Sequence, residues 1–176
     1  MSRRTALAVL LALSCVAAVA HTQVPIPEEN RSDLTVVPPR PSADGAQEHA
    51  RRLFEAILHD RPEHAADVFF PREAFVLVKS MAHPERYHAR LAQRFETDIH
   101  ALHRTLAATP EATFERLELT HRGGWVRPGE EGNRLPYWAA RHARLHYRVG
   151  STPRSLEVRV LISWGPRWYV IHLTDF

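Results

Sequence analysis

One carboxylate of this chain lies on an apolar helix face, a position suited to proton transfer. Between Pro84 and Leu106 apolar residues recur every three or four positions, which predicts a single amphipathic helix. Asp98 lies inside the apolar stripe, about 20° from Tyr87 around the helix axis. Burial there would raise the pKa of the carboxyl group, as a general acid or base requires. The alternative is a structural ion pair with Arg94, four residues earlier.

Three further residues are candidates for lining a ligand pocket together with Asp98. His88 lies in the first turn of the predicted helix, and about 15 Å of helical rise separates it from Asp98, which excludes direct contact between the two. A hydrogen-bonded packing role is the alternative for His88. Trp138 and Tyr147 lie on a predicted strand and would shape the cavity, or else close a small core.

A row of basic side chains follows one face of the same predicted strand and is a candidate interaction surface: His142, Arg144, His146 and Arg148. Because histidine gains charge as the pH falls toward 6, this row would become more positive in acid and could contact an acidic partner or lipid head groups. An ordinary exposed sheet face is the alternative. The two histidines lie about 13 Å apart along the strand, too far to share a metal ion.

The common catalytic and metal-binding motifs are missing from the sequence. There is no Gly-x-Ser-x-Gly, no Gly-rich phosphate loop and no His-Glu-x-x-His. His100 and His103 have the spacing of a metal pair, but no third ligand is evident nearby. We therefore predict no metal and no cofactor.

Lysine occurs once in this chain. Of the 23 basic residues only Lys79 is a lysine. A genome that favours arginine codons would explain this composition. The alternative is that an ammonium is required at this one place, because lysine adjusts its pKa to its surroundings where arginine does not.

The overall charge gives no support for nucleic-acid binding. The formal net charge is +3, but Arg3 and Arg4 belong to a predicted targeting segment without acidic residues. The remainder of the chain carries 21 basic and 20 acidic residues. Phosphate binding needs a clear excess of basic side chains, so nucleic acid is not a predicted partner.

The first 43 residues are predicted to lie outside the folded domain. Residues 1–20 have the charged start, the apolar run and the Ala18-Val19-Ala20 end of a signal peptide, which predicts export to the bacterial periplasm or the extracellular space. A lipoprotein-like site at Cys15 is the alternative, and it would make a membrane-anchored lipoprotein. Residues 21–43 hold five of the thirteen prolines and are predicted to be a disordered tether. Because Cys15 is the sole cysteine, no intrachain disulfide is possible.

Residues 44–176 are predicted to be a single α+β domain, with two or three N-terminal helices packed on a C-terminal four-stranded antiparallel sheet. Helical periodicity and capping signals predict helices over Asp44–His59, Pro62–Phe70 and Pro84–Leu106. Phe75–Val78 is compatible with helix or strand. Alternating apolar residues separated by Gly and Pro predict strands over residues 114–121, 138–149, 156–162 and 168–173.

This order of elements resembles the NTF2-like (cystatin-like) α+β superfamily. The resemblance is carried by the three predicted helices and by the strands from Phe114 to Phe176, about three-quarters of the chain, and by no motif. It implies a curved antiparallel sheet with helices in its concave side and a conical pocket between them. The superfamily includes enzymes, ligand binders and protein-interaction modules, so the resemblance does not select a function.

The sequence therefore favours an exported, non-enzymatic domain that binds a small ligand or a protein partner in the cell envelope. An NTF2-like pocket enzyme that uses Asp98 for proton transfer is the alternative. A third hypothesis is an interaction surface on the strand that carries Arg144 and Arg148.

Overall fold

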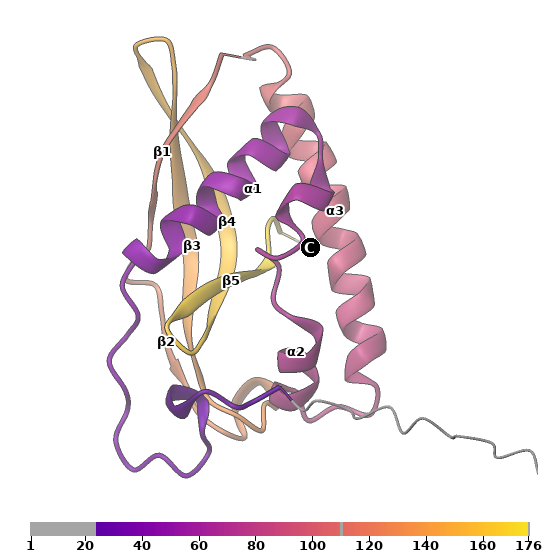
Figure 1. Ribbon diagram of the computed structural model, residues 1–176, viewed down its shortest axis with the longest axis vertical. Helices are drawn as coiled ribbons and strands as arrows, with labels where there is room; N and C mark the ends of the chain where they lie inside the picture. The colour runs from indigo at the N-terminus through magenta and orange to yellow at the C-terminus, as the bar shows by residue number, and fades with distance from the viewer. Residues whose placement is uncertain (1–23, 110, 176) are drawn as a thin grey trace, which may run out of the picture.

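The computed structural model describes residues 24–109 and 111–175 of the chain, with three α-helices followed by an antiparallel sheet (Figure 1). The predicted α+β class is therefore confirmed. The predicted signal peptide over residues 1–20, the lipidation candidate Cys15 and residues 21–23 of the predicted tether lie outside the described residues.

The three helices are α1 (Gln47–His59), α2 (Arg72–Val78) and α3 (Pro84–Leu106). The prediction for α3 is correct at both ends, with Pro84 in the first turn. The first turn of the predicted Asp44–His59 helix is a separate 3-10 helix, Asp44–Ala46. The Phe75–Val78 stretch is helical and forms the end of α2.

The predicted helix over Pro62–Phe70 is wrong beyond its first turn. Pro62–Ala65 forms a 3-10 helix, after which the chain extends along the edge of the sheet. The Phe70 N–H donates to the Val170 carbonyl, and the Val170 N–H donates to the Val68 carbonyl, both at 2.9 Å. These long-range bonds satisfy backbone groups that a helix would otherwise pair locally.

The sheet has five strands, β1 (Thr113–Glu118), β2 (Gly123–Val126), β3 (Tyr137–Val149), β4 (Thr152–Trp164) and β5 (Arg167–His172). Their order is β1-β3-β4-β5, and β2 also pairs with β3. The prediction of four strands missed β2, which lies in a glycine-rich stretch. With 13 residues, β3 is long enough to pair with β1 along its second half and with β2 along its first half.

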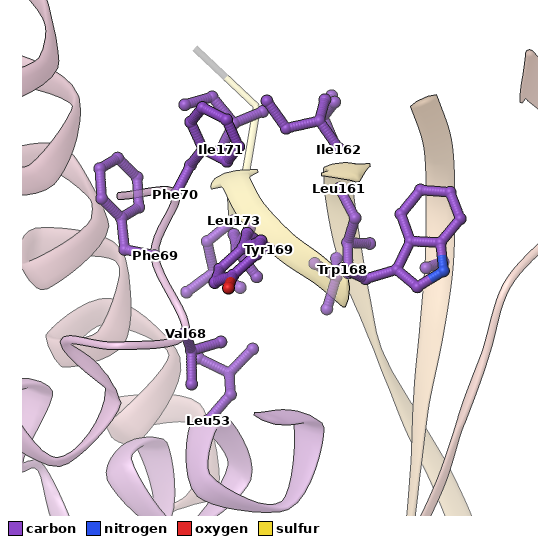
Figure 2. Packing of buried hydrophobic residues seen from close by; sticks show 14 of the residues in the cluster. Leu53, Val68, Phe69, Phe70, Leu161, Ile162, Trp168, Tyr169, Ile171 and Leu173 are labelled. Carbon is purple, nitrogen blue, oxygen red and sulfur yellow. The ribbon is translucent and has the colours of Figure 1, made fainter. Parts of the chain in front are cut away.

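The core lies between the helices and one face of the sheet. Helix α1 crosses the sheet, and α3 runs beside β5 (Figure 1). Figure 2 shows the Val68–Phe70 segment placed against β5, where Phe70 and Tyr169 come together with ring centroids 5.9 Å apart. Burial of such large side chains supplies the main stabilisation that a fold without disulfides needs.

The proline-rich segment contacts the fold over its described part, unlike the predicted free tether. The side chain of Asn30 is fully buried, donates to the Pro136 carbonyl at 2.8 Å and accepts from the Gly165 N–H at 2.7 Å. Further along, the indole N–H groups of Trp138 and Trp168 donate to the carbonyls of Pro38 and Pro41. We name residues 24–43 the N-terminal arm.

Candidate functional site

A cavity of about 100 Å³ lies between the end of α2, helix α3 and the inner face of the sheet. Its apolar wall residues include Phe75, Leu91, Ile162 and Ile171. Six side chains with polar groups line the same space: Lys79, Tyr87, Glu131, Tyr137, Arg141 and His172. A concave apolar surface with a few convergent polar groups is the usual form of a small-molecule site.

Lys79 reaches the cavity from the residue directly after α2. Backbone hydrogen bonds hold this point against the loop before β3: the Arg134 N–H donates to Val78 and the Ser80 N–H donates to Gly132. The Lys79 ammonium lies 3.5 Å from the backbone carbonyl oxygen of Glu131. Burial lowers the pKa of Lys79, and the negative charge of Glu131 partly opposes this shift.

Glu131 closes one side of the cavity and is held by two residues of β3. Its carboxylate accepts from the Arg141 guanidinium at 2.7 Å and from the Tyr137 hydroxyl at 3.2 Å. The Asn133 side-chain amide donates to the same hydroxyl at 2.9 Å. Burial raises the pKa of Tyr137 well above its usual range, and the Glu131 carboxylate raises it further, so the phenol keeps its proton. Glu131 adopts the left-handed backbone region, with φ 49°.

His172 forms the end of the cavity at the last residue of β5. Burial lowers its pKa, and the positive charges of Lys79 and Arg141 lower it further, while Asp98 has the opposite effect. Because an ordinary histidine has a pKa near 6.5, a lowered value leaves the imidazole mostly neutral at pH 7. The cavity thus combines two cations, one carboxylate, a protonated phenol and a neutral imidazole.

Asp98 lies outside this cavity. Its side chain is buried, accepts from the Arg94 guanidinium at 2.9 Å and from the Thr174 N–H at 3.3 Å, and borders a separate hollow of about 10 Å³. His172 borders both spaces. The ion pair between Arg94 and Asp98, which was the structural alternative, is therefore present. The charge of Asp98 acts on the cavity by opposing the lowering of the pKa of His172.

The other three predicted pocket residues lie elsewhere in the fold and do not meet Asp98 at one site. His88 is hydrogen-bonded through Nε2 to the Phe70 carbonyl at 2.7 Å, in agreement with the packing role. Trp138 packs on Trp125 with ring centroids 5.6 Å apart. Tyr147 is buried against Phe54. None of the three lines the cavity.

The predicted basic row on β3 is largely neutralised by acids on the adjacent strands. His142 contacts Glu157 at 2.8 Å, and His146 contacts Glu118 at 2.8 Å. Arg148 reaches Glu115 at 3.3 Å, whereas Arg144 is exposed. The hydrogen bond from His146 lowers the pKa of Glu118. Cross-strand pairing thus places negative charge beside most of the row.

Sequence reasoning missed Glu131, Tyr137, Arg141 and His172 as residues of the cavity. Arg141 carried a usable signal, because it follows Tyr137 and Ala139 at period two and places a cation on the otherwise apolar face of β3. Lys79 was singled out only as the sole lysine. Nothing local to Glu131 or His172 indicates that they face the same space.

The described residues contain neither a cluster of metal ligands nor a membrane-spanning helix. In residues 24–109 and 111–175 no three His, Cys, Asp or Glu side chains gather in a way that could hold a metal ion. The helices in the same ranges are all too short or too polar to cross a bilayer.

The fold and the cavity together define an α+β protein with an open antiparallel sheet and a small polar-lined pocket under its helices. Comparison of the chain with models of protein families, with curated proteins and with solved structures finds no significant match.

Proposed function

We propose that this protein binds a small organic anion with an apolar body in the cavity between Lys79 and Arg141. The observation that carries the proposal is the convergence of two basic side chains on one small space that also has apolar wall residues. Glu131 supplies one negative charge to this space, which leaves an excess of positive charge for a ligand to neutralise. The Tyr137 hydroxyl donates to Glu131, as Arg141 does, so the two residues together hold the one carboxylate of this space.

This proposal retains the ligand-binding function expected from the sequence but assigns it to the cavity at Lys79 and Arg141 instead of the predicted pocket around Asp98. Proton transfer by Asp98, the alternative, has less support because Arg94 and Thr174 occupy the two carboxylate oxygens outside the cavity. We also propose membership of the NTF2-like superfamily. A pocket between helices and the inner face of an antiparallel sheet supports it.

Ligand binding is tested by NMR titration of the ¹⁵N-labelled protein with hexanoate and benzoate, and with hexanamide and benzamide as uncharged counterparts. We expect the acids to shift backbone signals around Lys79, Arg141 and His172, with an affinity at least about tenfold above the amides, because a charge-assisted hydrogen bond is worth about 1.5–3 kcal/mol.

Two variants complete this test. Arg141→Gln should remove the preference for acids, whereas Arg154→Gln, at an exposed arginine on β4, should leave it unchanged. Equal affinity for acids and amides, or shifts that avoid the cavity, would refute binding of an anion at this site.

We further propose that the domain acts in the cell envelope, as the sequence of residues 1–20 indicates. The mass of the protein recovered from its own envelope fraction tests this. A chain that begins at His21 supports export as a soluble protein, and a lipid on Cys15 supports the anchored form. An intact N-terminus would contradict both.

A further inference from the structure

The sole lysine of the chain lies in the candidate ligand cavity. The other 22 of the 23 Lys and Arg residues are arginines. Many of them lie on the surface, where a lysine would supply the same positive charge. Arginine stays protonated in proteins, whereas lysine can lose its proton and act as a nucleophile. The only side-chain primary amine of the sequence therefore lines a cavity that a small molecule can enter.

The surroundings of Lys79 make its ammonium easier to deprotonate than that of an exposed lysine, so the cation that attracts an anion can become a nucleophilic amine. Its Nζ contacts a neutral carbonyl oxygen, that of Glu131, at 3.5 Å, while the Glu131 carboxylate is engaged by Arg141 and Tyr137. Phe75 and Leu91 supply apolar wall, and Arg141 is a second cation lining the same space. Burial lowers the pKa of Lys79, in agreement with this arrangement.

We propose that Lys79 forms an imine with a small oxo acid, an aldehyde or ketone that carries a carboxylate, bound in the cavity. The inference rests on the proposed anion site, in which Arg141 would take the carboxylate. It adds a reactive group to that site and so names the ligand class.

The proposed reaction is balanced without any co-reactant. The lone pair of the neutral Lys79 Nζ attacks the carbonyl carbon, and the π electrons of the C=O bond move to oxygen. The two protons of the amine nitrogen pass to this oxygen, which leaves as water, and the nitrogen electron pair that is freed forms the C=N bond. The neutral imidazole of His172 lines the same cavity and can relay these protons.

Reductive trapping of the full-length protein tests the proposal. The chain is incubated at pH 7 with 2-oxobutanoate and sodium cyanoborohydride, and intact mass and peptide mapping locate the product. We expect one addition per chain at Lys79. The Arg154→Lys variant provides an exposed side-chain amine in the same molecule, and we expect Lys79 to react at least about tenfold faster than this amine and than the α-amino group.

Uncharged butanone tests the role of the carboxylate. The ratio of labelling at Lys79 to labelling at the exposed amine cancels the different reactivities of the two carbonyl compounds. This ratio should be at least about tenfold higher for 2-oxobutanoate than for butanone, and Arg141→Gln should abolish the difference. Equal ratios would overturn the assignment to oxo acids.

The failures of the two proposals are distinguishable. Labelling of Lys79 no faster than that of the exposed amine overturns the imine, while hexanoate binding at the cavity by NMR would still support the anion site. Preferential labelling of Lys79 that excess hexanoate competes away supports both. Preferential labelling without competition would place the reaction outside the proposed anion site and overturn the inference as stated.

Discussion

Basic side chains around the cavity influence one another's ionisation. His172 is half-buried, and Lys79 and Arg141 both disfavour its protonated form. The carboxylate of Asp98 favours the protonated form. Asp98 therefore affects the pKa of a cavity residue, although it does not line the cavity itself. A measurement of the His172 pKa can thus distinguish the electrostatic role of Asp98 from its contribution to stability.

Asp98→Asn should lower the pKa of His172, because it removes the negative charge that stabilises the imidazolium. It should also reduce the free energy of unfolding by about 1–3 kcal/mol through the weakened bonds to Arg94 and Thr174. NMR titration of the imidazole and urea denaturation measure the two effects. Glu96→Gln, at an exposed position on the same helix, is the control and should change neither. An unchanged His172 pKa in Asp98→Asn would contradict the coupling.

Strand β2 depends on one of its two adjacent glycines. Gly123 has φ 108°, and a Cβ atom built on it would lie 2.4 Å from the Ala139 carbonyl oxygen of β3. A Cβ atom on Gly124 would meet nothing within 4 Å. The backbone therefore requires glycine at position 123 but not at position 124, although the two glycines look equivalent in the sequence.

Gly123→Ala should cost at least about 2 kcal/mol of unfolding free energy, because it combines a disfavoured φ with a backbone clash. Gly124→Ala should stay within about 0.5 kcal/mol of the wild type. Urea denaturation of the matched pair measures both values. Similar costs for the two variants would show that β2 does not pair with β3 as described.

The side chain of Asn30 is one of the attachments between the N-terminal arm and the fold. Asn30→Ala should cost about 2–4 kcal/mol, because it leaves the buried Gly165 N–H and Pro136 carbonyl without their partner. Asp33→Ala, which removes an exposed pair with Arg31 on the same arm, should cost less than about 0.5 kcal/mol. Limited proteolysis should also cleave the arm faster in Asn30→Ala. Equal stability of the two variants would mean that the arm adds nothing to the fold.

At the scale of the whole molecule, the lowered pKa of His172 makes stability depend on pH. The unfolded state binds this proton at a higher pH than the folded state does, so the free energy of unfolding rises with pH between the two pKa values. The cost of charging the half-buried imidazole is therefore absent above the unfolded pKa, near 6.5, and grows as the pH falls below it.

His172→Gln removes this cost. Between pH 7.5 and pH 5 the wild type should accordingly lose more stability than His172→Gln does, as measured by urea denaturation at each pH. His121→Gln, at an exposed position, should follow the wild type. Parallel curves for the wild type and His172→Gln would contradict a lowered His172 pKa.

The sequence alone determined the elements whose periodicity is local and long. The apolar stripe of α3 repeats often enough to identify the helix and its buried face, and the apolar runs of β3, β4 and β5 are long enough to identify the three strands. The same alternation contains the signal for Arg141, and composition alone marks Lys79 as unusual. Such features could be predicted because they depend on near neighbours in the chain.

The tertiary structure decided what depends on distant partners. Hydrogen bonds to β5 hold the edge segment at Val68–Phe70, and hydrogen bonds to β3 hold β2. The N-terminal arm is positioned by hydrogen bonds from Asn30 to the chain before β3 and to the turn before β5. The cavity combines side chains from α2, α3, β3, β4, β5 and the connecting loops, which are up to 97 residues apart. No local pattern specifies that these elements face one space, because that outcome is set by packing across the whole sheet.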